Sequence, residues 1–504
     1  MSERIAIVDL GSNSARLIIM QIFKNGAYNL IYHQKETVRL SEGIHENNTL
    51  HPEAMKRAIA TLQTFAKMCQ LYHTDKILAV GTAAIRNTKN GADFAKQIQS
   101  ETGIALKPIS GEAEAKLGYI GAMNTLDAND AVLFDLGGGS TELTLIRNRK
   151  AEKVISLPFG AVNLTERFCL QNKVTAEQLS QVNDFIQQEL AKVPWLHNLS
   201  VPLIGVGGTA RAIAKMDQKR KNYPFPKVHN YRMGSMAFYA LCKDTVSLSY
   251  AQRRKISGLS NERADIIVAG LQIVGNLFET VNSEQLIVSG CGVREGLFMQ
   301  YYLAHHGQGE VVENPLLHSA QNTLLFHNGS LSHANQVTKL AESLFDQFQG
   351  TMELEPRHKT LLKTAALLHD IGISVNYYDH YRHSTYLVEN ARLFGLSHRE
   401  QMMTAIIAGW HHGASVKFEH NRLYNEFLDE ANWHTARKLA LLLAMAESLD
   451  TTQLGVVEKV FVTITDTEVR FKLTTKGSAA LEAEALQKHA KWLKKDLGLG
   501  VSVE

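Results

Sequence analysis

Two short segments of this chain combine an aspartate with a turn of small residues in the same order. They read Asp9-Leu10-Gly11-Ser12-Asn13-Ser14 and Asp135-Leu136-Gly137-Gly138-Gly139-Ser140-Thr141-Glu142. Glycines let the backbone approach an anion and point N–H groups at it, while Ser and Thr hydroxyls add donors and a strand-end carboxylate can hold a divalent cation. Each segment therefore predicts a phosphate clamp. The predicted phosphate ligands are Ser12, Asn13, Ser14, Gly137, Gly138, Gly139, Ser140 and Thr141.

Three more turns of small residues follow apolar runs. In Gly81-Thr82-Ala83-Ala84-Ile85-Arg86-Asn87, Arg86 lies at the carboxyl end of a predicted strand, which is the usual ligand edge of an open α/β sheet. Its guanidinium suits bidentate phosphate binding. The second turn, at 205–210, leads into a predicted helix and adds Gly207, Gly208 and Thr209 as phosphate ligands. Residues 289–296 form a third turn of this kind.

A phosphate clamp that performs hydrolysis also needs a base, and residues 109–115 offer one. Glu112 and Glu114 lie at the start of a predicted helix. A carboxylate there can accept the proton of an attacking water molecule. Glutamate in a first helical turn also interacts favourably with the helix dipole without any catalytic role. Both interpretations stay open at this point.

These motifs require two α/β lobes to position them. Each aspartate segment lies between two β-like runs, as in a hairpin with a small-residue turn, and strands and helices alternate after it. From about residue 306 helical patterns with many histidines follow. In the last stretch, apolar and polar residues alternate on either side of Asp466-Thr467, as in a small hairpin. We predict an α/β lobe over 1–125, a second α/β lobe over 126–305, an all-α domain over 306–452 and a small α+β segment over 453–504.

The composition indicates a multidomain cytoplasmic enzyme. The chain has 504 residues, 45% of them hydrophobic and 20% charged, with a net charge of +3. Its four cysteines lie far apart in the sequence with no C-x-x-C spacing, so we expect them to be reduced thiols. We expect no signal peptide and no membrane span, because the first strand begins within a few residues and the apolar runs are short.

Basic residues gather at Lys215, 219–221, Arg232 and 253–255. Such runs are usually solvated faces. They are weak candidates for distal contacts with a polyanion, and no motif for sequence-specific nucleic-acid binding accompanies them.

The ordered series of motifs over residues 4–300 resembles the exopolyphosphatase/guanosine pentaphosphatase (Ppx/GppA) family of the actin-like ATPase superfold. The resemblance implies two ribonuclease-H-like lobes around a cleft that removes terminal phosphates with Mg²⁺, in a homodimer. It implies Glu114 as the general base, and Asp135 and Glu142 as metal-linked and water-positioning carboxylates, with Asp9 also at the Mg²⁺. The chain departs from the family pattern at Ala113, where an acid is common, and at Asn87, where Asp is frequent.

The histidine-rich part carries a possible second metal site. His369-Asp370 resembles the motif of HD phosphohydrolases, and imidazole and carboxylate can hold Mn²⁺, Fe²⁺, Zn²⁺ or Mg²⁺. Resembling proteins often have an HD-like domain with eroded ligands, which favours a scaffold instead. Both alternatives stay open. The candidate ligands of one or two divalent ions are His333, His369, Asp370, His383, His411 or His412, and Asp450.

Two classes of function fit these observations. The first is an exopolyphosphatase acting on inorganic polyphosphate, with guanosine pentaphosphate hydrolysis as a related activity of the same apparatus. The second is a sensor of nucleotide or polyphosphate coupled to an HD phosphohydrolase or a partner. A base favours catalysis, because a pure sensor would not need one. A sugar kinase is a weaker third alternative, since a sugar-binding segment would be expected.

Overall fold

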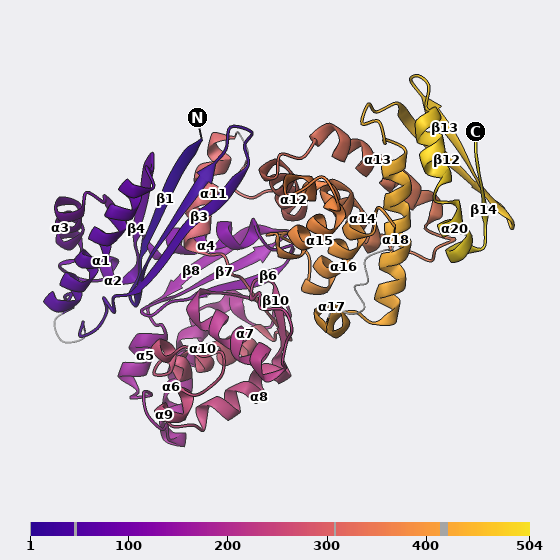
Figure 1. The fold of residues 1–504 in the computed structure, drawn as a ribbon. Helices are drawn as coiled ribbons and strands as arrows, with labels where there is room; N and C mark the ends of the chain where they lie inside the picture. The colour runs from indigo at the N-terminus through magenta and orange to yellow at the C-terminus, as the bar shows by residue number, and fades with distance from the viewer. Residues whose placement is uncertain (1, 45–47, 307–308, 414–421) are drawn as a thin grey trace. The chain divides into compact units, whose positions relative to one another are not determined.

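The computed structural model describes residues 2–44, 48–306, 309–413 and 422–504. It divides into two compact units (Figure 1). The first comprises Met1–Lys24 and Tyr28–Pro315, and the second comprises Asn25–Ala27 and Leu316–Glu504. No helix within the described ranges is long and apolar enough to cross a membrane.

The first unit contains two mixed β-sheets. Their strands are β1 (Glu3–Leu10), β2 (Ser14–Ile22), β3 (Tyr28–Thr37), β4 (Lys76–Gly81), β5 (Leu106–Pro108), β6 (Ala131–Leu136), β7 (Thr141–Arg147), β8 (Lys150–Leu157), β9 (Leu203–Val206), β10 (Tyr231–Gly234) and β11 (Gln285–Val288). The first sheet has the order β3-β2-β1-β4-β5 and the second β10-β11-β9-β6-β7-β8. The second sheet therefore repeats the first and adds the antiparallel edge strand β10.

Strand β1 shows why the first sheet is covered on both faces. Its residues alternate between two apolar cores, with Ile5 and Ile7 in one and Ala6 and Val8 in the other. Helices α1 (Pro52–Leu71) and α3 (Gly91–Thr102) contribute to the Ala6 core. A sheet buried on both faces needs such a continuous apolar run, which the sequence supplies.

The other core depends on a close crossing between helices α4 (Gly111–Met123) and α11 (Val293–His305). A Cβ on Gly121 would lie 2.2 Å from the carbonyl oxygen of Gly292, and one on Gly296 would lie 1.9 Å from that of Leu117. Only glycine permits this approach. The crossing therefore fixes the N-terminal turn of α11 against the C-terminal half of α4.

Helix α4 follows the first sheet in sequence but packs on the second, and helix α11 follows the second sheet but packs on the first. Helix α4 packs against β7 and β8, and the Tyr119 hydroxyl donates to the carbonyl of Arg149 (2.7 Å). Helix α11 packs against β1, and the Tyr301 hydroxyl donates to the Glu3 carboxylate (2.6 Å). The two sheets are thus joined through the helix pair.

The remaining helices of the first unit are α2 (Ala83–Arg86), which packs beside β4 of the first sheet, and a group that follows the strands of the second sheet. The group consists of α5 (Ala161–Arg167), α6 (Ala176–Ala191), α7 (Gly207–Arg220), α8 (Ser235–Val246), α9 (Tyr250–Arg253) and α10 (Ile267–Val281). Helix α10 is almost entirely buried in the core of the second sheet.

The second unit is mainly helical and ends in a small three-stranded sheet. Its helices are α12 (Pro315–Phe326), α13 (Leu331–Phe348), α14 (Pro356–Leu368), α15 (His380–Asn390), α16 (His398–Gly409), α17 (Arg422–Phe427), α18 (Glu430–Ser448), α19 (Ala480–Gln487) and α20 (Ala490–Leu497). The sheet contains β12 (Val457–Ile464), β13 (Glu468–Thr475) and β14 (Gly500–Val503). The predicted fold class, two α/β lobes followed by a helical part and a small α+β segment, is confirmed. The four domain boundaries stay a prediction.

Candidate active site

The two predicted hairpins have matching turns. The Gly11 N–H donates to the carbonyl of Ser14 (3.1 Å), and the Gly137 N–H donates to that of Ser140 (3.0 Å). Asp135 lies in register with Glu142 across β6 and β7, so their side chains lie on the same face of the sheet. The sequence therefore repeats a local geometry as well as a residue pattern.

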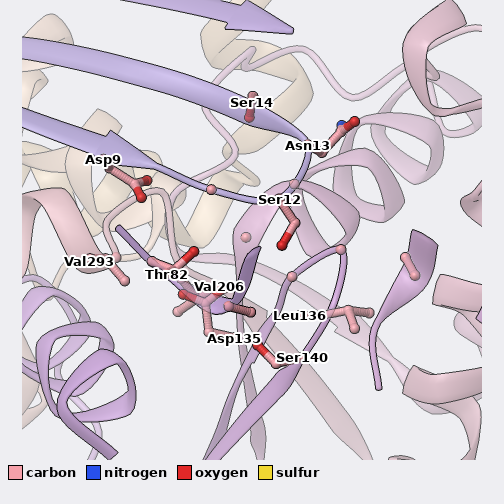
Figure 2. A pocket seen from close by; sticks show the side chains of 18 of the residues that line it. Asp9, Ser12, Asn13, Ser14, Thr82, Asp135, Leu136, Ser140, Val206 and Val293 are labelled. Carbon is pink, nitrogen blue, oxygen red and sulfur yellow. The ribbon is translucent and has the colours of Figure 1, made fainter. Parts of the chain in front are cut away.

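Both turns open onto one cavity of about 100 Å³. This volume accommodates several water-sized groups. Figure 2 shows Asp9, Ser12, Asp135 and Ser140 around this space. The predicted site residues that line the cavity are Asp9, Ser12, Asn13, Ser14, Glu114, Asp135, Gly137, Gly138, Gly139, Ser140, Gly207 and Gly208.

Three predicted phosphate ligands, Thr141, Thr209 and Arg86, are not part of the cavity wall. The hydroxyl of Thr141 is fully buried and donates to the carbonyl of Phe159 (2.7 Å), so it ties β7 to the segment after β8. Thr209 is buried in helix α7, with its hydroxyl 3.5 Å from Nη1 of Arg263. The structure assigns both threonines packing contacts, and the prediction that they face a phosphate is corrected.

Arg86 pairs with two glutamates at the edge of the cavity. Its Nη1 donates to Oε2 of Glu114 (2.9 Å) and to the carbonyl of Ile109 (3.0 Å). Its Nη2 lies 3.8 Å from Oε1 of Glu142, which also accepts a hydrogen bond from Ser156 (2.8 Å). Arg86 and Glu142 are therefore behind Glu114 rather than in the cavity wall.

Burial shifts the protonation of the carboxyl groups in this region. It raises the pKa of Asp135 to about 6 and, with the charge of Asp135, the pKa of Glu142 to about 7. Burial, followed by repulsion from Glu142, raises the pKa of Glu114 well above its ordinary value, while the hydrogen bond from Arg86 opposes the rise. A carboxyl whose pKa lies close to the working pH is suited to proton transfer.

Four arginines in the cavity wall were missed by the sequence analysis: Arg16, Arg211, Arg263 and Arg294. Burial and then repulsion from Arg16 lower the pKa of Arg211 to about 9 and that of Arg263 to about 10. A bound anion would offset this repulsion. Arg16 could have been found, because it lies in register with Asp9 across the first hairpin. Arg211 directly follows the predicted turn at 205–210 and Arg294 lies within the turn at 289–296, so both could have been found from those motifs, whereas no local motif accompanies Arg263.

Asp9 and Asp135 offer oxygen ligands to a divalent cation. Within the described ranges no donor makes a hydrogen bond to either carboxylate, although burial raises the pKa of both groups and the charge of Asp9 raises that of Asp135. Carboxylate oxygens and water molecules are the ligands that Mg²⁺ prefers. A cation between two unsatisfied carboxylates would remove their repulsion, so these residues fit Mg²⁺.

The absence of a side chain at Gly207 leaves room for the carboxylate of Asp135. The φ of +92° at Gly207 is unfavourable for other residues, and a Cβ there would lie 2.8 Å from Oδ1 of Asp135. Gly207 also begins helix α7, so the N-terminal end of this helix, with Gly207 and Gly208, lies in the cavity wall. An anion at this end would meet the positive end of the helix dipole.

The predicted basic run includes one residue that cannot contact a distal polyanion. Arg253 is fully buried, and its guanidinium donates to the carbonyls of Gln171 and Asn172 (2.7 Å for Asn172). Arg220 and Lys221 are paired with Asp244 and Asp217. Arg253 is therefore a structural residue of the second lobe.

Most of the predicted ligands in the helical unit lie together. His333, His369 and Asp370 form one group, and His411 joins His380 and His412 in a second. Among the described residues, His383 belongs to neither group. His380, one turn earlier on α15, occupies the ligand position that was predicted for His383. Asp450 lies behind His333, with its Oδ2 2.8 Å from Nδ1 of that histidine.

Comparisons with known proteins agree with the fold. Residues 18–305 match the model of the Ppx/GppA phosphatase family, and residues 318–494 match the model of Ppx/GppA phosphatase, domain III. The crystal structure of the Ppx/GppA family member from Aquifex aeolicus is 30% identical and covers 60% of this chain and 99% of its own, with a TM-score of 0.53. An exopolyphosphatase from Cytophaga hutchinsonii shares the fold at 23% identity and a TM-score of 0.57, covering 62% of this chain and 100% of its own. Because the first family model spans more than half of the sequence, the chain belongs to the Ppx/GppA phosphatase family.

Proposed function

We propose that the first unit is an exopolyphosphatase that hydrolyses the terminal phosphate of inorganic polyphosphate. One observation carries the proposal. A single cavity joins two Gly/Ser turns and four guanidinium groups to a buried glutamate, Glu114. The turns and guanidiniums suit a chain of phosphates, and the glutamate suits the activation of water.

The character of the cavity wall supports inorganic polyphosphate over a nucleotide. None of the described residues that line the cavity is aromatic, so no ring is available there to stack on a purine. The four arginines instead match repeated phosphate groups, since each guanidinium can bind two phosphate oxygens. Guanosine pentaphosphate, whose terminal phosphates are chemically similar, is the second candidate substrate.

In the proposed mechanism, Glu114 accepts a proton from a water molecule whose oxygen attacks the terminal phosphorus. The bond from that phosphorus to the bridging oxygen breaks, and the shortened chain leaves with the negative charge. Arg86 orients Glu114 through its 2.9 Å hydrogen bond. The N–H groups of the turns and of α7 hold the terminal phosphate, and the arginines stabilise the developing charge.

Asp9 and Asp135, with Glu142 behind them, would hold Mg²⁺ in this site. When bound, Mg²⁺ neutralises phosphate oxygens and acts as a Lewis acid. The homodimer and the cytoplasmic location stay predictions.

The test is phosphate release from long-chain polyphosphate and from guanosine pentaphosphate, measured side by side with Mg²⁺. We expect a higher kcat/KM for polyphosphate, and release one phosphate at a time from the chain end. A higher kcat/KM for guanosine pentaphosphate would assign the site to the second substrate. Tight binding of either compound without phosphate release by the wild-type protein would contradict catalysis and support a sensor.

A further inference from the structure

The second unit contains a group of four histidines around one carboxylate that the proposed function does not use. His333 lies on α13, His369 directly follows α14, His380 begins α15 and His411 follows α16. Their Nε2 atoms lie 3.1–3.7 Å from the carboxylate of Asp370. Residues from four helical segments thus converge on a single acidic side chain.

The other ring nitrogen of each histidine already has a partner. Nδ1 of His333 faces Asp450 (2.8 Å), and Nδ1 of His369 faces the carbonyl of Ala366 (2.8 Å). The Nδ1 atoms of His380 and His411 likewise face backbone carbonyls, those of Tyr377 and Ala408. These oxygen partners can only accept a hydrogen bond, which assigns the Nδ1–H tautomer to each ring in its neutral form. The four Nε2 lone pairs are then directed toward Asp370.

Two of these Nε2 atoms have no hydrogen-bond partner in the part of the chain that the structure describes. They belong to His333 and His369, whose residues are 3% and 1% exposed. In addition, Nε2 of His380 lies 3.2 Å from Nε2 of His411, although both are acceptors in this tautomer. Buried acceptors that face one another and a carboxylate are costly unless a cation lies between them. Histidine ligands of metals commonly have this arrangement, with the second ring nitrogen held by a carboxylate or a backbone carbonyl.

We propose that the second unit binds a pair of divalent transition-metal ions with the Asp370 carboxylate between them. His333 and His369 supply the first ion together with Asp370, and His380, His411 and His412 supply the second. Within each of the two groups of three residues, the possible ligand atoms lie within 4.8 Å of one another. Asp370 connects the groups, because its Oδ1 lies 3.1 Å from Nε2 of His380 and its Oδ2 lies 3.7 Å from Nε2 of His333.

The ligand set indicates the class of metal. Imidazoles with one carboxylate suit Mn²⁺, Fe²⁺, Co²⁺, Ni²⁺ or Zn²⁺ better than Mg²⁺, which prefers oxygen. His412 is exposed and the Asp370 side chain is 23% exposed, so one side of the group is open for metal entry and for water ligands. This site is therefore chemically distinct from the Mg²⁺ site proposed in the first unit.

The test is elemental analysis of the full chain purified without chelator and in excess Mg²⁺. We expect about two equivalents of transition metal per chain, about one in His380→Gln, and less than about half an equivalent in Asp370→Asn. Two variants serve as matched controls. His383→Gln changes a histidine on the same helix that belongs to neither group, and Asp135→Asn changes the proposed Mg²⁺ site; both should keep the wild-type content.

A folded wild-type protein that stays metal-free after incubation with each of these ions would overturn the proposal. Equal metal content in Asp370→Asn and the wild type would also overturn it. Should a variant fail to fold, reconstitution of chelated wild-type protein with Co²⁺ provides a second measurement. We expect visible absorption that saturates at about two equivalents, and a spectrum of unligated Co²⁺ would contradict the site.

Discussion

Arg16 and Glu142 occupy equivalent positions in the two hairpins. Arg16 lies in register with Asp9 across β1 and β2, and Glu142 lies in register with Asp135 across β6 and β7. The repeated structure therefore places opposite charges beside two matching aspartates. The first lobe supplies a cation for the substrate, whereas the second supplies a further carboxylate beside the proposed metal and base.

Replacement of Glu114 by Gln should lower kcat for polyphosphate by about 10²-fold or more, because it removes the proton acceptor but nearly preserves the shape. Binding of polyphosphate should persist. The matched control is Glu112→Gln, two residues earlier on the same helix and exposed. If phosphate release by Glu114→Gln stays within a few-fold of the wild type, Glu114 is not the base.

Substitution of Arg86 should change the pH dependence of turnover. The proposed mechanism requires the deprotonated form of Glu114, so kcat should fall as the pH drops below the pKa of that group. The hydrogen bond from Arg86 lowers this pKa. In Arg86→Gln the pKa therefore rises, and the acidic limb of the kcat profile should move to higher pH, whereas Arg86→Lys keeps the charge and should move it less. An unchanged limb in Arg86→Gln, with only KM raised, would identify Arg86 as a phosphate ligand alone.

Asp9→Asn and Asp135→Asn should each raise the Mg²⁺ concentration needed for half-maximal activity, because each removes a negative charge from the proposed cation site. Mg²⁺ titrations of phosphate release provide the measurement. Asp130→Asn is the control, since that carboxylate pairs with Arg147 near the start of β6. Titration curves identical to the wild type in both site variants would reject the assignment.

Gly296→Ala should destabilise the protein by about 1–3 kcal/mol, because the added methyl group overlaps the backbone of α4 at Leu117. The control is Gly275→Ala in α10. There the added Cβ would lie 3.6 Å from the Phe238 ring, an ordinary contact, so the usual helical preference for alanine should apply. Urea unfolding of both variants measures the difference. Equal stability of Gly296→Ala and the wild type would show that the crossing relaxes without cost.

The sequence predicted what depends on local pattern. Both hairpins, their turns and the position of Glu114 at the start of a helix depend on neighbouring residues, and the structure has them as expected. Arg211, Arg263 and Arg294 were missed because three separate segments bring them to the cavity. The turns beside Arg211 and around Arg294 were predicted, but the sequence does not show that these guanidiniums and that of Arg263 meet at one cavity.

The histidines illustrate a different limit. His380 and His383 are one turn apart on the same helix, and spacing alone does not show which of them faces the neighbouring helices. The choice depends on where α15 begins. Asp379, with a left-handed φ of +55°, precedes that start, and His380, the first residue of the helix, lies with its Nε2 3.2 Å from Nε2 of His411. Thr141 likewise follows the glycine turn in sequence, but the packing of β7 directs its hydroxyl to Phe159.

The exchange of helices between the two lobes would couple a motion of the lobes to the proposed base, Glu114. Because α4 packs on the second sheet and α11 on the first, a rotation of one sheet against the other would slide the two helices along each other at Gly121 and Gly296. That sliding would shift Glu114 relative to Arg86, which lies at the end of α2 beside the first sheet. Opening of the cleft to admit or release a phosphate chain would therefore disengage the proposed base, and water would be activated only with the lobes closed on substrate.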